Sequence, residues 1–156
     1  MESIKYNSLN NLMKEYDISK INKSYINLLK QLTTADYLSD DIFLQKINLI
    51  FKIGLIYVSY IENINDKSDI KIIGTGTIII EPKLIHNGMS IGHVEDIVID
   101  NNYRGNGTSQ KILDELTKHA ITNNCYKIIL DCDENIKKVY EKNGFLKKDI
   151  QMVKYF

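Results

Sequence analysis

Residues 92–110, which read GHVEDIVIDNNYRGNGTSQ, decide the fold of this chain. Their first half is rich in the β-branched residues typical of a strand, and a helical pattern begins after Gly107. Gly105 and Gly107 are expected to expose backbone N–H groups at the start of that helix. Because these donors and the positive end of the helix dipole both favour an anion, the turn predicts a phosphate site.

Two common phosphate-binding motifs do not fit this turn. A dinucleotide fingerprint needs a third glycine where this chain has Gln110, and a P-loop needs Gly-Lys-Ser/Thr after Gly107. The pattern Arg/Gln-x-x-Gly-x-Gly/Ala fits residues 104–109, with Ser109 as the last small residue. It resembles the pyrophosphate loop of the GNAT superfamily of acyl-CoA-dependent N-acetyltransferases. A glycine-rich turn without a ligand is the alternative.

The composition indicates one folded domain over residues 1–156. A chain of 156 residues with 44% hydrophobic content is long enough for one buried core and short for two. Its 20 basic and 20 acidic residues cancel, so nothing in the net charge favours nucleic acid or an anionic membrane. The lysine-rich C-terminal quarter suits a polyanionic small ligand, and a solvated lysine-rich surface is the alternative.

The chain also lacks the sequence features of export, membrane insertion and metal binding. Its N-terminus has no signal-peptide core, and the longest apolar stretch, residues 53–61, is far shorter than the ~20 residues of a membrane span. Cys125 and Cys132 are interpreted as reduced core residues, and the three histidines have no metal-ligand spacing. We therefore expect a cytoplasmic protein that binds neither a membrane nor a metal ion.

Hydrophobic periodicity predicts a mixed α/β sheet with crossover helices in its second half. Asp17 is expected to cap the first helix, which Thr33-Thr34 ends, and Asn143-Gly144 to stop the last helix. A polar turn at 63–69 is expected to join two strands as a hairpin. The expected strands are 10–15, 53–61, 70–80, 94–99, 127–131, 145–148 and 150–156, and the expected helices are 18–32, 40–51, 108–122 and 135–142.

Several segments resemble the glucosamine-6-phosphate N-acetyltransferases, a family of the GNAT superfamily. They are IIIEPKLIH at 78–86, GHVEDI at 92–97, the loop at 104–109, CYKIILDCDE at 125–134 and YEKNGF at 140–145, with LTT at 32–34 upstream. Together they cover most of residues 78–145. The resemblance implies an α/β (α+β) chain with the GNAT acyl-CoA N-acyltransferase fold, in which helices flank a mixed, mostly antiparallel sheet.

The resemblance implies an enzyme that acetylates the amine of glucosamine 6-phosphate with acetyl-CoA, by direct attack, on the route to UDP-N-acetylglucosamine. Tyr140 matches the family's tyrosine beside the CoA sulfur, where a phenol can protonate the departing thiolate; a core aromatic is the alternative. Asp131 matches the family's acid and would accept the ammonium proton. Because an unperturbed Asp is a poor base, it could instead orient the amine or a water. Cys132 is interpreted as packing rather than as an acetyl carrier.

Ligand contacts are implied by position. Backbone N–H groups of residues 97–99 would meet the thioester oxygen where two strands separate. Glu95 and Asp96, expected on opposite faces of a regular pleat, would bind sugar hydroxyl and ammonium groups, unless they are only a solvated strand-end pair. The implied cofactor contacts are Ile97, Val98, Ile99, Arg104, Gly105, Asn106, Gly107, Thr108, Ser109 and Gln110, and the implied substrate contacts are Thr33, Lys83, Leu84, Ile85, His86, Glu95, Asp96, Tyr126, Lys127 and Lys154.

The resemblance further implies a homodimer. The family completes its site across two subunits, and Tyr126 with Lys127 would serve the neighbouring one. The expected last strand, at 150–156, is apolar at alternate positions and would pair with a second chain.

Two departures from the family pattern leave other functions open. No arginine follows Arg104, so Tyr155 stands where the family has a phosphate-binding arginine. The lysines that could replace it are Lys83, Lys127 and Lys154. Ile136 occupies the place of a family asparagine, with Asn135 one position early, which leaves one cofactor hydrogen bond open. A GNAT enzyme for another amine and a non-catalytic acyl-CoA-binding protein are the alternatives.

Overall fold

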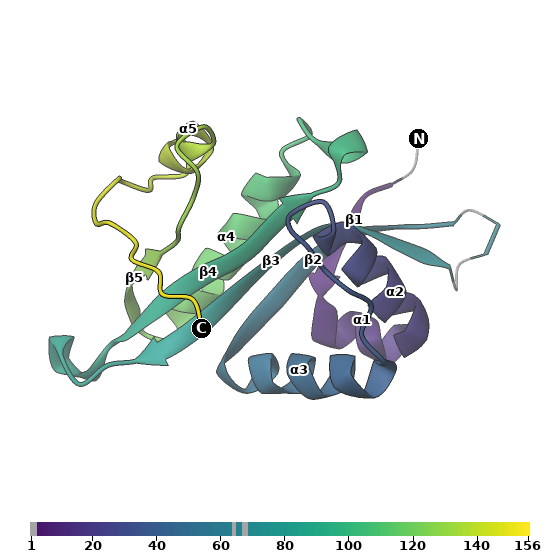
Figure 1. Cartoon of the computed structure of the whole chain (residues 1–156), viewed down its shortest axis with the longest axis horizontal. Coiled ribbons are helices and arrows are strands. Elements are labelled where there is room, and N and C mark those ends of the chain that lie inside the picture. Colours follow the sequence, from purple (N-terminus) through teal and green to yellow (C-terminus); the bar gives the residue numbers. More distant parts are fainter. Residues whose placement is uncertain (1–2, 64, 67–68) are drawn as a thin grey trace.

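The computed structural model describes residues 3–63, 65–66 and 69–156, and Figure 1 shows how its elements are arranged. In chain order they are β1 (Lys5–Ser8), α1 (Leu9–Glu15), α2 (Ile18–Leu29), α3 (Asp40–Ile53), β2 (Gly54–Glu62), β3 (Ile70–Pro82), η1 (His86–Gly88), β4 (Ser90–Ile99), η2 (Asn101–Tyr103), α4 (Thr108–Thr122), β5 (Cys125–Ile129) and α5 (Lys137–Glu141).

The strands form one sheet in the order β1-β2-β3-β4-β5. The first four pair antiparallel, and β5 joins β4 in parallel because α4 carries the chain back across the sheet. Helices α1, α2 and α3 cover one face and α4 the other (Figure 1). A separate cluster of buried apolar side chains lies on each side. The expected mixed, mostly antiparallel sheet flanked by helices is confirmed.

Three helices lie where periodicity predicts them. Asp17 caps α2, since its carboxylate accepts hydrogen bonds from the backbone N–H groups of Ser19 and Lys20 at 3.0 and 3.2 Å. Helix α3 extends slightly past the expected end, and α4 has the expected bounds. Helix α2 ends early, at Leu29, and a hydrogen-bonded turn replaces its expected last turn. The hairpin of β2 and β3 is confirmed, although residues 64, 67 and 68 of its turn lie outside the described residues.

The predicted strand at residues 10–15 is wrong, because these residues belong to α1. Leu9 and Leu12 are both fully buried, and their spacing of three suits one face of a helix. The Ser8 hydroxyl starts the helix by accepting a hydrogen bond from the backbone N–H of Asn11 at 3.3 Å. The first strand, β1, lies just upstream and pairs with β2.

The predicted strands at 145–148 and 150–156 are also wrong, since these residues are in neither helix nor strand. Leu146, Ile150 and Met152 are each 87% exposed, because a single chain offers their apolar side chains no surface to pack on. β5 ends at Ile129, two residues before the predicted end, and α5 spans only Lys137–Glu141. The predicted element order therefore fails at both ends of the chain.

Both cysteine thiols are free, and their interpretation as core residues is wrong for Cys132 alone. Cys125 is partly buried on β5 and packs against the core on the α4 side, whereas Cys132 is exposed in the segment after that strand. Within the described parts of the chain, no helix is both long and apolar enough to cross a bilayer.

Candidate active site

Strands β4 and β5 separate after a few paired residues. Their register runs from Ser90↔Cys125 to His93↔Ile129, whereas β4 continues to Ile99. Beyond His93, no described residue pairs with β4 on its β5 side. The expected split between neighbouring strands is therefore confirmed. It presents the backbone of Ile97, Val98 and Ile99, whose contact with a thioester stays a prediction.

A bulge in β4 lies beside this split. Glu95 pairs with Thr77 and Val98 with Thr75, so Asp96 and Ile97 together face one residue, Gly76. Asp96 has a φ of 53°, a left-handed conformation that costs a residue other than glycine about 1 kcal/mol. Bulges of this kind re-aim side chains. The expectation that Glu95 and Asp96 lie on opposite faces of a regular pleat is therefore wrong, and both residues are exposed.

The carboxylate of Glu95 is influenced by two others near the bulge. Burial, then the negative charges of Asp96 and Asp131, raise the pKa of Glu95. Desolvation raises the pKa of Asp96, although the residue as a whole is exposed. Asp131 lies in the exposed segment beyond β5 rather than at the end of a buried strand, which corrects the prediction from the sequence. The group can accept hydrogen bonds or protons from a cationic amine.

A buried layer of hydroxyl groups, missed by the sequence analysis, supports the bulge from the α2 side. Thr75 donates a hydrogen bond of 3.2 Å to the hydroxyl of Tyr25, and both residues are buried. Burial is the main cause that raises the pKa of Tyr25 to about 12, and the negative charge of Asp96 adds to it. Asp96 thus lies within electrostatic reach of this layer. The sequence does not reveal this layer, because α2 and β3 are far apart along the chain.

The predicted phosphate loop has the required backbone geometry. Gly105 and Gly107 have φ values of 81° and 71°, and a Cβ added at either would meet no atom within 4 Å. Gly107 is the N-cap of α4 and has no side chain that could accept a hydrogen bond, so the N-cap residue leaves the first N–H groups of the helix open. Arg104 Nε donates to the carbonyl of Ile99 at 3.1 Å, which ties the loop to the end of β4.

The other predicted loop residues differ in exposure. Thr108 is buried and its Oγ1 lies 3.4 Å from the Tyr6 hydroxyl. Ser109 is partly buried, whereas Asn106 and Gln110 are exposed. Gln110 donates to the carboxylate of Asp114 at 2.8 Å. The loop is therefore anchored by the buried Thr108, while its backbone around Asn106 remains exposed.

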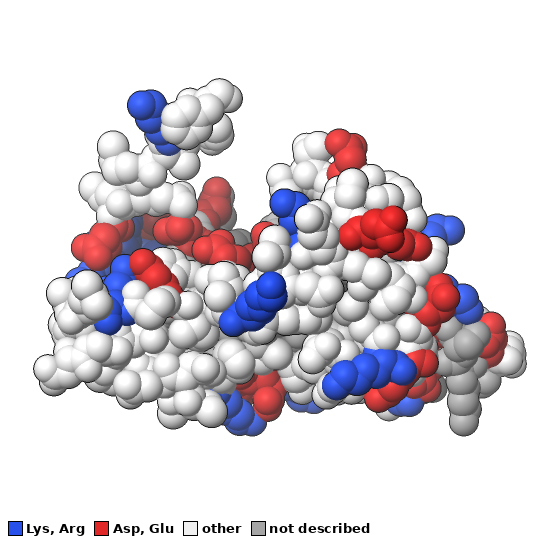
Figure 2. Space-filling model, turned by 90° about the horizontal axis from the view of Figure 1, so that it is seen from below, with Lys and Arg blue, Asp and Glu red and all other residues white. Residues whose placement is uncertain are grey.

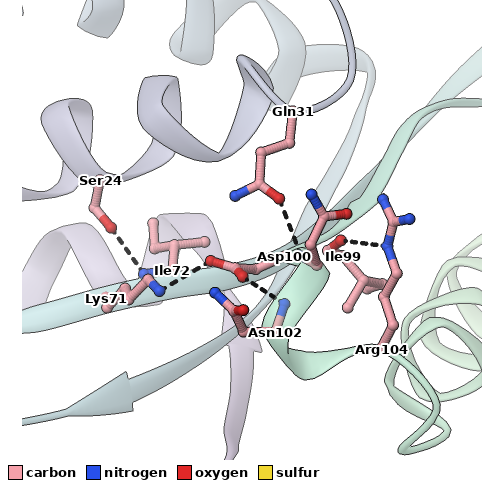
Figure 3. A network of polar contacts seen from close by, with 9 residues as sticks. Ser24, Gln31, Lys71, Ile72, Ile99, Asp100, Asn102 and Arg104 are labelled. Carbon is pink, nitrogen blue, oxygen red and sulfur yellow. Dashed lines mark hydrogen bonds and ion pairs between the residues drawn. The ribbon is translucent and has the colours of Figure 1, made fainter.

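Asp100 anchors this loop and was not singled out from the sequence (Figure 3). It is only 3% exposed, accepts a hydrogen bond from the backbone N–H of Asn102 at 2.9 Å, and forms an ion pair with Lys71 at 2.9 Å. Burial alone would raise the pKa of Asp100, but the bonds from Lys71 and Asn102 outweigh it and hold the pKa below the usual value.

Tyr140 lies on α5 and is buried. Its ring meets that of Phe145 edge-on at 6.0 Å, and its carbonyl accepts a hydrogen bond from the Phe145 backbone N–H at 3.1 Å. Burial, and secondarily Cys132, raise the pKa of the phenol. Tyr140 is therefore part of the apolar core, as one interpretation of the sequence expected, and its part in catalysis stays a prediction.

The structure brings together some of the predicted substrate contacts. The rings of His86 and Tyr126 lie 4.1 Å apart, and Lys127 Nζ lies 5.6 Å from the Tyr126 ring. Lys83 forms an ion pair with Glu81, whose other carboxylate oxygen lies 2.7 Å from His93 Nε2. The Lys83 and His93 bonds lower the pKa of Glu81.

Other predicted contacts lie apart from this group. Leu84 and Ile85 are exposed on the loop before η1, and Thr33 is exposed on the turn after α2. Lys154 lies in the C-terminal segment, 5.6 Å from the Phe156 ring. Among residues 3–63, 65–66 and 69–156, no three His, Cys, Asp or Glu side chains are grouped so as to hold a metal ion.

Known proteins resemble this chain over nearly its whole length. The sequence model of the Acetyltransferase (GNAT) family matches residues 27–145. The chain belongs to the GNAT family. Glucosamine 6-phosphate N-acetyltransferase of Arabidopsis thaliana is 37% identical over 92% of this chain and 95% of its own, and glucosamine 6-phosphate N-acetyltransferase 1 of Dictyostelium discoideum is 39% identical over 89% and 87%. The crystal structure of the Arabidopsis enzyme has a TM-score of 0.83, with 36% identity over 99% of both chains.

These findings confirm the GNAT fold and the resemblance inferred from the sequence. This GNAT protein is thus an acyltransferase, and GNAT acetyltransferases use acetyl-CoA. The split between β4 and β5, together with the open loop at Gly105 and Gly107, is a site suited to an acyl donor that bears a pyrophosphate.

Proposed function

We propose that this GNAT protein transfers the acetyl group of acetyl-CoA to the 2-amino group of glucosamine 6-phosphate, releasing CoA and N-acetylglucosamine 6-phosphate. The observation that carries the proposal is the arrangement around β4. An open phosphate loop follows the strand, and the carboxylates of Asp96 and Asp131 add to the burial that raises the pKa of Glu95 beside the split. Near full-length similarity to enzymes of that name supports the choice of amine.

The reaction would be direct. The neutral amine attacks the thioester carbonyl carbon, a C–N bond forms, and the C–S bond breaks to release the CoA thiolate. Backbone N–H groups of residues 97–99 stabilise the oxyanion. Asp131 takes the ammonium proton, directly or through a water, and Tyr140 gives a proton to the thiolate. The raised pKa of Tyr140 supports its part, since the phenol holds its proton at neutral pH.

The phosphate of the sugar would be held by lysines, because the chain has no arginine after Arg104. Lys127 is the best supported of the three, since it lies beside the His86–Tyr126 pair. Lys83 is already bound to the carboxylate of Glu81, which offsets part of its charge. Lys154 lies on the exposed C-terminal segment, where it would act only after that segment has docked.

The active form would be a homodimer. Residues 146–156 are exposed, and the apolar Ile150, Met152 and Val153 are 87%, 87% and 61% exposed. This segment stands out from the body of the molecule over a row of acidic side chains (Figure 2). A second copy would cover these apolar side chains and bring each segment to a neighbouring site. The cytoplasmic location expected from the sequence stays a prediction.

Release of the CoA thiol tests the proposal. The protein is incubated with acetyl-CoA and glucosamine 6-phosphate, and with glucosamine or glucose 6-phosphate as parallel controls. Release with the phosphorylated amino sugar alone is expected. Equal release with glucosamine would remove the phosphate site from the proposal, and no release with any of the three would direct attention to another amine.

A further inference from the structure

Asp100 lies at the junction between the phosphate loop and the face of the sheet that α1, α2 and α3 cover. Its backbone N–H donates to the carbonyl of Ile73 on β3 at 2.8 Å, and its carbonyl accepts from the Tyr103 backbone N–H at 2.8 Å. The preceding carbonyl, that of Ile99, accepts from Arg104. Any displacement of residues 99–103 therefore moves the first residue of the phosphate loop.

Gln31 reaches the same junction from the turn after α2, as Figure 3 shows. Its Oε1 accepts a hydrogen bond of 3.0 Å from the backbone N–H of Asn101, although the two residues are 70 positions apart. The Gln31 amide is also among the groups that lower the pKa of Asp100. Residues 100 and 101 are thus held from two sides, by Lys71 on β3 and by Gln31.

The turn that carries Gln31 also carries Thr33. The backbone N–H of Gln31 donates to Leu28 at 3.0 Å, and that of Thr33 donates to Leu29 at 3.1 Å. Both bonds fix the turn to the last residues of α2, so Gln31 and Thr33 move together. Thr33 is exposed beside the loop to α3 and is a predicted substrate contact.

We propose that Gln31 and Asp100 are positioning residues that couple acetyl-CoA binding at the phosphate loop to amino-sugar binding by the turn that bears Thr33. The inference rests on the proposed function for the identity of the two ligands. A pyrophosphate on the loop at Arg104 restrains residues 99–103 further, and the Asn101–Gln31 hydrogen bond transmits that restraint to the turn. The second ligand then loses less conformational entropy on binding, so each ligand strengthens the other.

Calorimetry of the whole protein tests the coupling. The Kd of glucosamine 6-phosphate is measured without CoA and with saturating CoA, which cannot transfer an acetyl group. We expect CoA to tighten sugar binding about fivefold or more in the unaltered chain. In Gln31→Ala this factor falls close to one. The matched control is Gln45→Ala, an exposed glutamine on α3, which keeps the factor of the unaltered chain.

A second measurement does not depend on the sugar. Amide hydrogen exchange at residues 31–34 should slow when CoA binds to the unaltered chain and to Gln45→Ala, but not to Gln31→Ala. Asp100→Asn should weaken CoA binding and the same protection. Full protection in Gln31→Ala, or an unchanged coupling factor, would overturn the inference. If CoA protects the turn yet glucosamine 6-phosphate does not bind, the proposed substrate is wrong, while the link between the phosphate loop and the turn through Asn101 and Gln31 is still supported.

Discussion

The side chain of Gln151 donates a hydrogen bond of 2.7 Å to the carboxylate of Asp131. This bond links the C-terminal segment to the carboxylate group beside the split of β4 and β5. The negative charge of Asp131 also contributes to raising the pKa of Glu95, so the two carboxylates interact electrostatically at the proposed amine site. Asp131 is therefore the first residue whose chemistry should be tested.

Asp131→Asn should lower kcat by about 100-fold, the usual contribution of a positioned base, because an amide cannot take the ammonium proton. The KM for acetyl-CoA should change little. Asp133→Asn is the matched control, since this neighbouring side chain is exposed and its Oδ1 can still accept from the Asn135 backbone as the amide. Steady-state rates for both variants decide the question, and equal rates would remove Asp131 from proton transfer.

Tyr140→Phe should keep the fold and lower kcat by about 100-fold, because only the phenolic proton is lost. The ring contact with Phe145 survives the change, so the melting temperature should stay close to that of the unaltered chain. Tyr57→Phe, a half-buried tyrosine on β2, serves as the control. Unchanged turnover in Tyr140→Phe would leave this residue with packing alone.

The raised pKa of Tyr140 makes a separate prediction about pH. Burial and Cys132 raise that pKa above its ordinary value of about 10, so the proton is present below that pH and is lost only above it. The kcat of the unaltered chain should therefore show no fall from phenol ionisation below about pH 10. An alkaline limb near pH 8 that disappears in Tyr140→Phe would contradict this assignment.

Asp100→Asn should destabilise the fold by about 1–2 kcal/mol at neutral pH, since the ion pair with the half-exposed Lys71 is lost. The folded-state pKa of Asp100 is lowered, so its stabilisation is fully present above the unfolded pKa of about 3.9 and is lost as the pH falls through the folded pKa. Urea unfolding from pH 7 to pH 3 should show that the free energies of unfolding of the unaltered chain and of Asp100→Asn converge below about pH 4. A difference between the two free energies that stays constant with pH would contradict the explanation.

Local signals in the sequence were sufficient for part of this structure. Asp17 caps its own helix, and Gly105 with Gly107 shapes its own turn, so neighbouring residues decide both. The bulge at Asp96 was missed because it arises from the register of β4 against β3, which no local pattern states. The contacts that hold Asp100 and Asn101 were missed for the same reason, since Gln31 is distant in sequence.

The C-terminal prediction failed for a different reason. Alternating apolar residues at 150–156 predict a strand, but a strand needs a partner edge, and the single chain leaves this segment unpaired. The same pattern therefore supports a second chain rather than a free end.

Lys127→Ala should raise the KM for glucosamine 6-phosphate by about tenfold and leave the KM for acetyl-CoA unchanged, because one charge contact to the phosphate is lost. Lys148→Ala, an exposed lysine of the lysine-rich C-terminal quarter, is the control. If both lysine variants behave alike, Lys127 has no special part in binding the phosphate.

Ile150→Asp should weaken the proposed homodimer, because it places a charge among apolar side chains that a second copy would bury. Sedimentation velocity over a range of concentrations should show the unaltered chain at twice the mass of one chain, and Ile150→Asp shifted toward the single chain. Ile121→Asp alters an exposed isoleucine at the end of α4, 69% exposed, and should leave the mass unchanged. Because the sugar site would be completed across subunits, kcat/KM for glucosamine 6-phosphate should fall together with the dimer fraction. A fully active single chain would contradict both the dimer and the shared site.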